Sequence, residues 1–456
     1  MHHPDATVTW IFAALLALMV VALAMEEKLH AKKSIITGVT AAIALFLADA
    51  FHILPLDRYT LNLGDGHIRE LPVYIPGIEW EVIAIIFGAS LFVDVTAKSG
   101  LFSWIAVKLT RLSGGDPYWL LFYYGGMTIL FSAFLNNVAA MLIVGSLTVV
   151  SLEKLERRKL LMPFLLIEGL LTNVGGLLTL ISSVPNIIVG KAAGIEFVVF
   201  FLKAAPFVVV AGVITILLGA RIFHVRRLTD PEEKRRARAL VESFNPADTI
   251  TSRGFFAFSG IMFVALVLML SLTGFLPIVK DLGMGYVALV FGLVSALRFK
   301  ASVDKTYAAL DWDLLAFFGT LFIVVDVMEH AGVLGLIGQA IGVLVGLGDQ
   351  LGAGSLLAAS AVTSSVTDNI PLAAVLANIL GSMDGVNSDS NLWWCVIFGA
   401  NLGGNLTPIG SASTVVAVTI MHKHGIKLSF FGFVKAALPF AAVQIALAMV
   451  YVLVVL

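Results

Sequence analysis

Long apolar stretches alternate with short polar ones along almost the whole chain of 456 residues. A helix that crosses a bilayer needs about 20 mostly apolar residues in succession. The pattern predicts ten such spans, at about 8–25, 34–54, 80–97, 161–190, 197–222, 255–277, 283–298, 312–330, 391–420 and 429–456. The sequence therefore predicts an all-α polytopic membrane protein.

Two further apolar stretches, at about 117–150 and 352–380, are interrupted in the middle by polar residues. The interruptions read Ser132-Ala-Phe-Leu-Asn-Asn-Val138 and Thr363-Ser-Ser-Val-Thr-Asp-Asn-Ile-Pro371. Non-helical backbone at membrane depth survives only where protein buries it or where it lines a wet cavity. We therefore predict a re-entrant hairpin in each stretch, with its tip at the polar residues.

The second half of the chain repeats the first. Trp80 and Trp312 lie 232 residues apart, and the same shift places Asn137 on Asn369. Further along the chain the shift becomes 228. There, seven of eleven positions are identical between Asn173-Val-Gly-Gly-Leu-Leu-Thr-Leu-Ile-Ser-Ser183 and Asn401-Leu-Gly-Gly-Asn-Leu-Thr-Pro-Ile-Gly-Ser411. Polar residues and glycines matched inside apolar segments indicate a true internal repeat.

Each half contains five spans and one hairpin, and an odd number of spans inverts the second half relative to the first. We expect a first inverted repeat at residues 1–222, a cytoplasmic linker at 223–254 and a second inverted repeat at 255–456. Inverted repeats with broken helices are typical of secondary transporters, whose sites lie at the midplane between the repeats. The predicted fold is an inverted repeat of two five-helix halves, each with a re-entrant hairpin and a broken helix.

Composition and charge agree with this class and give an orientation. Charged residues make up 13% of the chain and hydrophobic residues 59%, with a mean hydropathy of +0.98, which excludes a soluble globule. Basic residues gather in connections on one side of the predicted topology, eight of them at about 221–253. The positive-inside rule makes that side cytoplasmic and predicts a multi-pass protein of the cell inner (plasma) membrane. The net charge of −1 indicates no nucleic-acid partner.

Each hairpin tip is expected to meet a helix that is broken at a Gly-Gly pair. Glycine lets the backbone leave helical geometry and come close to a ligand, and a broken helix exposes N–H groups with partial positive charge. Two matched tips beside two matched breaks therefore predict a substrate site. Its predicted members are Asn136, Asn137, Asn173, Gly175, Gly176, Thr179, Ser182, Ser183, Asn186, Asn369, Asn401, Gly403, Gly404, Asn405, Thr407, Ser411, Ser413 and Thr414.

Four acidic residues fall within predicted membrane segments: Asp94, Glu168, Asp326 and Asp368. An ionisable group there costs at least about 2.5 kcal/mol and is a functional candidate by default. We therefore expect these residues to couple transport to an ion, either H⁺ or Na⁺; for Asp94 and Asp326, near segment ends, an interfacial or structural role is the alternative. Asp368 is the strongest candidate because it lies in the second tip, where the first tip has the neutral Asn136.

The residues give no support to metal or enzyme chemistry. Cys395 is the single cysteine, which excludes a disulfide framework and any multi-thiolate metal site. No His-x-x-x-His pair lies in an apolar segment, and His-Glu-x-x-His does not occur. We expect no metal, no cofactor and no enzymatic activity.

At this point the chain resembles the ion transporter superfamily, within it the branch that holds ArsB-type arsenite efflux permeases and the P protein. The resemblance rests on Ser132-Ala-Phe-Leu-Asn-Asn-Val138, Thr172-Asn-Val-Gly-Gly176, Pro185-Asn186, Thr367-Asp-Asn-Ile-Pro371 and Gly403-Gly-Asn-Leu-Thr-Pro-Ile-Gly410. It implies a scaffold with a moving transport part, a site at the tips and breaks, and a homodimer. Many similar sequences have an acidic residue in place of Asn136, and Gly-Asp-Pro-Pro-Asn in place of Ser182-Ser-Val-Pro-Asn186, so two carboxylates are absent here.

The resemblance leads to a first functional hypothesis, proton-coupled efflux of arsenite or antimonite across the inner membrane. Arsenite near neutral pH is a small neutral trihydroxide, which Asn, Ser and Thr side chains can hydrogen-bond. Such an exporter would also imply an ATPase subunit as a partner, beside the lipid bilayer. The alternatives are a sodium/proton antiporter and a transporter of a small carboxylate or other oxyanion. Opposed half-helix N-termini favour an anion, although neither tip contains an arginine.

Overall fold

The structure is a computed structural model that describes residues 5–54, 59–62, 68–72, 74–298 and 303–456. In these residues, all regular structure is helical except for one antiparallel hairpin of β1 (Tyr59–Asn62) and β2 (Ile68–Leu71), in which Tyr59 is paired with Leu71. The prediction of an all-helical membrane protein is confirmed, apart from this hairpin, which the apolar pattern did not predict.

The helices follow the predicted segments closely. Before the linker they are α1 (Ala6–Ala24), α2 (Glu26–Leu29), α3 (Lys33–Ala50), α4 (Trp80–Lys98), α5 (Leu101–Leu112), α6 (Pro117–Ser132), α7 (Asn137–Lys154), η1 (Arg158–Leu160), α8 (Leu161–Gly175), α9 (Val184–Ala192) and α10 (Phe197–Ile222). The linker contains α11 (Pro231–Glu242) and η2 (Pro246–Thr249). After it come α12 (Arg253–Leu272), α13 (Pro277–Arg298), α14 (Val303–Ala309), α15 (Trp312–His330), α16 (Val333–Val345), α17 (Asp349–Ser364), α18 (Asn369–Ser382), α19 (Asn391–Gly403), α20 (Ala412–Lys423) and α21 (Phe430–Val454).

The helices from α4 to α10 and those from α15 to α21 have the same order of features. Each series begins with two helices that meet at a glycine in the left-handed region, Gly100 (φ 85°) and Gly332 (φ 74°). Glycine adopts this conformation without the steric cost that a side chain adds. A helical hairpin and a broken helix follow, and each series ends in a long helix with an internal proline, Pro206 or Pro439.

The number of membrane spans differs from the prediction. Among the described residues, eight helices are long and apolar enough to cross a membrane, or nine if α15 and α16, bent by 79°, form one span. Ten were predicted because 161–190 and 391–420 each counted as one span. In the structure each is two short helices, α8–α9 and α19–α20, whose halves are too short to qualify. Conversely α7, predicted as half of a hairpin, has 18 residues and qualifies by itself.

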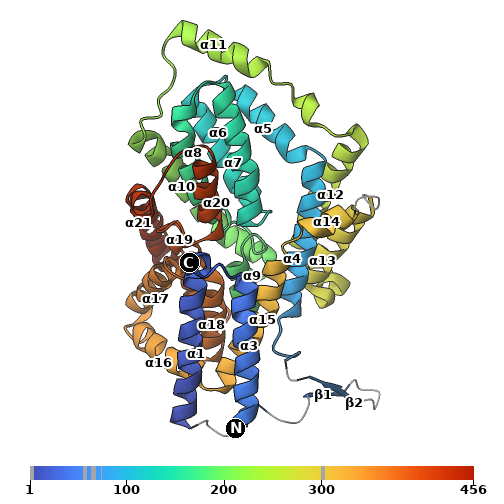
Figure 1. Cartoon of the computed structure of the whole chain (residues 1–456), viewed down its shortest axis with the longest axis vertical. Coiled ribbons are helices and arrows are strands. Elements are labelled where there is room, and N and C mark those ends of the chain that lie inside the picture. Colours follow the sequence, from blue (N-terminus) through green and yellow to red (C-terminus); the bar gives the residue numbers. More distant parts are fainter. Residues whose placement is uncertain (1–4, 55–58, 63–67, 73, 299–302) are drawn as a thin grey trace.

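The two hairpins lie toward opposite ends of the molecule. Figure 1 shows α6 and α7 in the upper part and α17 and α18 in the lower part, with α9 and α19 between them. The linker helix α11 lies at the upper end, and the β1–β2 hairpin lies at the lower end. Early and late helices also pack together, α3 along α15 and α13 along α4. The second contact is very close, because a Cβ on Gly88 would lie 2.3 Å from the carbonyl carbon of Ala288.

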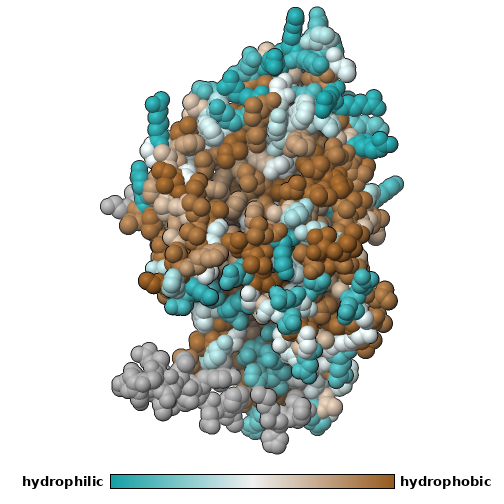
Figure 2. All heavy atoms as spheres, turned by 180° about the vertical axis from the view of Figure 1, so that it is seen from behind, coloured by the Kyte–Doolittle hydropathy of each residue, from teal (hydrophilic) through white to brown (hydrophobic). Residues whose placement is uncertain are grey.

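The molecular surface is strongly apolar over its middle. Phe46, Ile261 and Val450 are 73%, 68% and 60% exposed, and many other large hydrophobic side chains are exposed on the same helices. Figure 2 shows hydrophobic residues gathered over the middle of one face and hydrophilic residues at the end that carries α11. An apolar surface of this extent is typical of a protein whose surface is covered by the lipid of a bilayer. The core beneath it is centred on α8 and α19, whose residues are almost all buried.

Candidate functional site

Two matched breaks interrupt helices in the centre of the molecule. The α8 helix ends at Gly175 and α9 starts at Val184, while α19 ends at Gly403 and α20 starts at Ala412. The segments between them, 176–183 and 404–411, are the first and second breaks. Both occur where the sequence predicted them, at the Gly-Gly pairs.

The glycines are needed at the breaks for close approach and not for an unusual backbone conformation. Gly176 (φ −60°, ψ −15°) and Gly404 (φ −57°, ψ −15°) have dihedral angles that any residue adopts. A Cβ on Gly175, however, would lie 2.6 Å from the carbonyl oxygen of Ile129 in α6, and one on Gly403 would lie 2.2 Å from that of Ala361 in α17. We expected the Gly-Gly pairs to let the backbone leave helical geometry. The structure corrects this: the glycines let each broken helix pack directly against the backbone of a hairpin.

Each hairpin tip is hydrogen-bonded to its break through the same contacts. The tips are residues 132–137 and 364–369, where the two helices of each hairpin meet. The Ser132 hydroxyl donates to the Thr172 carbonyl oxygen at 2.6 Å, and the Ser364 hydroxyl donates to the Ala400 carbonyl oxygen at 2.5 Å. All four positions correspond under the shifts of 232 and 228 residues.

In a second pair of matched contacts, a hydroxyl in each break donates to a carbonyl oxygen in the tip. The Thr179 hydroxyl in the first break donates to the Ala133 carbonyl oxygen, and the Thr407 hydroxyl in the second break donates to the Ser365 carbonyl oxygen at 2.5 Å. Hydroxyl donors that satisfy buried carbonyls at a helix end remove the cost of leaving those groups unpaired. The tips and breaks are thus held together as the sequence predicted.

Asparagine side chains connect the two breaks. The Asn173 amide donates to Asn405 Oδ1 at 2.8 Å and to Ser411 Oγ at 2.9 Å. Asn173 Oδ1 accepts from the side-chain amide of Asn137 in the first tip at 3.1 Å and from the Ser413 hydroxyl at 3.3 Å. Asn173 therefore joins the first tip to the second break.

A second set of hydrogen bonds joins residues at the first break to Asn401, which precedes the second break. The Ser183 hydroxyl donates to Asn401 Oδ1 at 2.7 Å, and the Asn401 amide donates to Asn186 Oδ1 at 2.9 Å. The Asn186 amide donates to the carbonyl oxygens of Gly176 and Thr179. We call these two sets, with the neighbouring hydroxyls, the polar network; its buried members are Asn173, Thr179, Ser182, Ser183, Asn186, Asn401, Asn405, Thr407, Ser411, Ser413 and Thr414.

The network extends to two residues that the sequence analysis missed. Gln444 in α21 accepts from the Asn405 amide at 2.7 Å and donates to the Thr215 hydroxyl in α10 at 2.9 Å. Both side chains are buried. A single glutamine in the apolar span at 429–456 was a signal that could have identified this extension, because an unpaired amide inside a membrane protein is costly.

The two tips differ in their side chains. Asn136 and Asp368 occupy matched positions, and each caps the following helix, by accepting from the N–H of Ala139 at 2.7 Å and of Ile370 at 3.0 Å. Asp368 also accepts a hydrogen bond from Lys33 Nζ, with which it forms an ion pair. Asn137 bonds to Asn173 and Ser132, whereas its counterpart Asn369 makes no side-chain hydrogen bond to the described part of the chain.

The other acidic candidates do not bond to a tip or a break among the described residues. Asp94 pairs with Lys98 at 2.5 Å in α4, and Asp326 lies 3.8 Å from His330 in α15. Glu168 in α8 is fully buried, and one carboxyl oxygen accepts from Thr148 in α7 at 2.6 Å. Its other carboxyl oxygen has no hydrogen-bond partner in the residues that the structure describes.

Four helices begin at the tips and breaks, namely α7, α9, α18 and α20. The first turn of a helix carries unpaired N–H groups and about half a positive charge. The tips and breaks contain one ionisable side chain, Asp368, and the Lys33 ammonium offsets its charge. The electrostatic character of the site therefore suits an anion or a neutral polar solute better than a cation.

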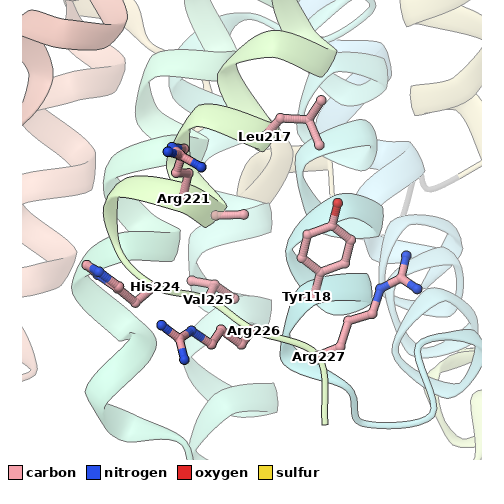
Figure 3. Close-up of a pocket in the computed structure, with 8 residues that line it drawn as sticks. Tyr118, Leu217, Arg221, His224, Val225, Arg226 and Arg227 are labelled. Carbon is pink, nitrogen blue, oxygen red and sulfur yellow. The ribbon is translucent and has the colours of Figure 1, made fainter. Parts of the chain in front are cut away.

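A cavity of about 890 Å³ lies away from this site, at the end of α10. Figure 3 shows Arg221, His224 and Arg226 on one side of it and Tyr118 with Arg227 on the other. The Arg227 guanidinium lies 5.0 Å from the centroid of the Tyr118 ring. None of the predicted site residues lines this cavity, which belongs to the basic end of the molecule beside the linker.

The described residues contain no group of three or more His, Cys, Asp or Glu side chains that could hold a metal ion. The donors gathered at the tips and breaks are amides, hydroxyls and backbone groups. Such donors are suited to hydrogen-bonding an organic or oxygen-rich solute.

Comparison with known proteins decides the family. The profile of the citrate transporter family (CitMHS) matches residues 20–399. The chain belongs to the citrate transporter family. Family membership confirms a transporter rather than an enzyme, and a multi-pass protein of the plasma membrane. It also agrees with the resemblance to the ion transporter superfamily.

Relatives of this citrate transporter family member are found in bacteria and animals. A 46 kDa membrane protein of Mycobacterium leprae is 29% identical over 429 residues, which cover 90% of this chain and 97% of that protein. The P protein of Homo sapiens is 25% identical over 510 residues, covering 94% of this chain and 60% of that protein. The crystal structure of the YdaH transporter of Alcanivorax borkumensis has the same fold, with a TM-score of 0.61 at 14% identity, and the match covers 93% of this chain and 98% of that one.

Proposed function

We propose that this protein is a secondary transporter of a small carboxylate, bound between the two tips and the two breaks. The observation that carries the proposal is the meeting of four helix N-termini with a network of amides and hydroxyls. Such N-termini bind anions through free N–H groups and partial positive charge. The family name points to the same class of solute.

The small carboxylate takes the place of arsenite, the first hypothesis from sequence. No relative or matched family named above refers to arsenite, whereas a citrate transporter family implies carboxylates. The expected ATPase subunit applied to arsenite export and is not proposed here, while the homodimer stays a prediction. The sodium/proton alternative needs a free carboxylate at the site, and Asp368 is paired with Lys33.

The same proposal includes the architecture. Residues 1–222 and 255–456 are inverted repeats joined by the linker at 223–254, and the carboxylate is exposed to each side of the membrane in turn. The matched hydrogen bonds of Ser132 and Ser364, and of Thr179 and Thr407, support this arrangement because equivalent residues make equivalent contacts. Inverted repeats exchange their conformations as the carrier changes the side that is open.

Within the site, Asn369 is the side chain best placed to contact the solute. Its amide is not engaged in the network and is only partly buried. Asn137, its counterpart in the first tip, is held by Ser132 and Asn173 and positions the network. We assign the remaining contacts to the N–H groups at the starts of α9 and α20 and to the hydroxyls of the breaks.

Uptake into proteoliposomes tests the proposal. The full chain is reconstituted, and uptake of radiolabelled citrate, malate and succinate is followed under an imposed proton gradient, with arsenite measured in parallel. We expect uptake of at least one carboxylate, competed by the unlabelled compound. Uptake of arsenite with no carboxylate would overturn the assignment.

A substitution then links uptake to the site. Loss of a hydrogen bond to a charged group costs about 1.5–3 kcal/mol, so Asn369→Ala should reduce carboxylate affinity about 10-fold to 100-fold. Asn391→Ala, at the start of α19 and outside the network, is the matched control and should behave as the unaltered protein. Equal affinities for the two variants would remove Asn369 from the site.

A further inference from the structure

The ion pair between Lys33 and Asp368 joins distant parts of the chain. Lys33 is the first residue of α3, and Asp368 lies 335 residues later in the second tip. The Lys33 and Asp368 side chains are only 26% and 12% exposed, so the pair is largely shielded from water. Glu26 Oε1 lies 3.9 Å from Lys33 Nζ, which places the ammonium between two carboxylates. A shielded pair of this kind interacts more strongly than a surface pair.

The Lys33–Asp368 ion pair has no counterpart at the first tip, as a comparison of equivalent contacts at the starts of α15 and α4 indicates. The Ser34 hydroxyl donates to Asp313 at the start of α15. At the equivalent place the Met284 N–H donates to Glu81 at the start of α4, at 3.2 Å. Asp313 and Glu81 correspond under the shift of 232 residues, and aligning the two contacts places Lys33 on Gly283, the residue before Met284.

The first tip lacks both partners of the ion pair. Gly283 has no side chain, and the tip residue matched to Asp368 is the neutral Asn136. The lysine and the aspartate are thus present together in one half and absent together from the other. This pattern is expected of two groups that form an ion pair, because a carboxylate shielded from water and without a partner is destabilising.

The Lys33 ammonium satisfies one oxygen of the Asp368 carboxylate. It carries one positive charge and donates to Asp368 Oδ2. A sodium ion that bound the same carboxylate would have to displace the ammonium and compensate for the hydrogen bond that Lys33 donates to Asp368. The other Asp368 oxygen is occupied in capping α18 through the Ile370 N–H at 3.0 Å. Both oxygens of the carboxylate are therefore already satisfied from within the chain.

We propose that Lys33 is a built-in cation of the transport site, which takes the place of a coupling sodium ion at Asp368 and makes the carrier independent of sodium. The inference rests on the proposed function, because it places the second tip at the solute site. Lys33 acts through Asp368 and is a positioning residue, since it keeps the tip carboxylate neutralised. Its removal leaves the Asp368 carboxylate without its cation, and carboxylate oxygens are ligands that a hard cation prefers.

Sodium binding tests this inference without any transport. Thermal unfolding of the detergent-purified full chain is measured in sodium chloride and in choline chloride at equal ionic strength, which keeps charge screening the same. We expect no sodium-specific shift for the unaltered protein and a saturable rise in Tm with sodium for Lys33→Met. The double variant Lys33→Met/Asp368→Asn should lose that rise. Lys32→Met, which changes the exposed neighbouring lysine, is the matched control and should show no rise.

Transport in proteoliposomes gives the second measurement and uses the unaltered protein as well. Carboxylate uptake should proceed at the same rate in sodium and in choline, while Lys33→Met should transport slowly in choline and faster when sodium is added. Sodium-dependent uptake by the unaltered protein would overturn the inference even if Lys33→Met does not fold. A folded Lys33→Met that shows no sodium-specific Tm shift would also overturn it. If no carboxylate is transported at all, the proposed function fails, and the unfolding measurement still decides the role of Lys33.

Discussion

One added methyl group at Gly175 or Gly403 would test whether the tips must press against the breaks. A Cβ on Gly175 would lie 2.6 Å from the Ile129 carbonyl oxygen, and one on Gly403 would lie 2.2 Å from that of Ala361. Ordinary contact begins at 3.4 Å. The hairpin and the break would therefore have to separate by about 0.8 Å in the first half (3.4 − 2.6) and about 1.2 Å in the second (3.4 − 2.2).

The energetic cost follows from these displacements. Overpacking of a tightly packed interior costs about 1–3 kcal/mol, and here rigid backbone, not a flexible side chain, has to move. Separation would also lengthen the 2.6 Å bond from Ser132 to Thr172 and the 2.5 Å bond from Ser364 to Ala400, each worth about 1 kcal/mol. We expect the free energy of unfolding to fall by about 2–4 kcal/mol for each variant, with a larger effect at Gly403.

Thermal unfolding in detergent and uptake into proteoliposomes together provide the assay. Gly126→Ala is the control, because Gly126 lies in α6 near the same contact but has open space where a Cβ would be added. Alanine there should be neutral or stabilising, since it favours helix over glycine by about 1 kcal/mol. The reasoning is refuted if Gly175→Ala and Gly403→Ala melt and transport as Gly126→Ala does.

Three further substitutions give independent checks. Thr148→Val should lower Tm, because it leaves both oxygens of the buried Glu168 without a partner at a cost of about 1–3 kcal/mol, whereas the same change at the exposed Thr419 should not. Gln444→Leu should lower the free energy of unfolding by a similar amount and weaken carboxylate uptake, since the Asn405 amide loses its acceptor. Calorimetry and uptake are measured on one preparation, and a loss of stability with unchanged uptake would contradict the link to the site. Arg227→Ala should cost no more than about 1 kcal/mol and leave uptake unchanged, because its contact with Tyr118 lies at the exposed basic end.

The positions of the tips and breaks could be predicted from sequence because their residues are out of place in a membrane. Asparagine and paired glycine stand out inside apolar runs, and their recurrence at fixed shifts identified both copies. Local chemistry sufficed for α10 and α15 as well, whose bounds agree with the predicted spans at 197–222 and 312–330. The same reasoning gave the wrong cause for the glycines, since close approach to another helix depends on tertiary packing and cannot be read from one segment.

Long-range partners could not be predicted in the same way. Lys33 counted only as a basic residue of a connection, and nothing within its own segment indicates a contact 335 residues away. Gln444 was one polar residue in an apolar span, with a signal too weak to give its partner. The β1–β2 hairpin was missed because its short strands lie outside the apolar periodicity that organised the prediction. In each case the missing information is the relative placement of elements.

The match between the halves and the mismatch of their charges have separate consequences for a carrier. The hydroxyl-to-carbonyl contacts repeated in both halves hold the two tips to their breaks to a similar extent, so we expect them to favour neither orientation of the proposed cycle. The Lys33–Asp368 pair is present at one tip only. We expect it to break when the second tip changes its position in the proposed cycle. A contact made in only one of two states shifts their equilibrium by its full strength. We therefore expect Lys33 to influence which side of the membrane the empty carrier faces at rest, in addition to its proposed role in place of a sodium ion.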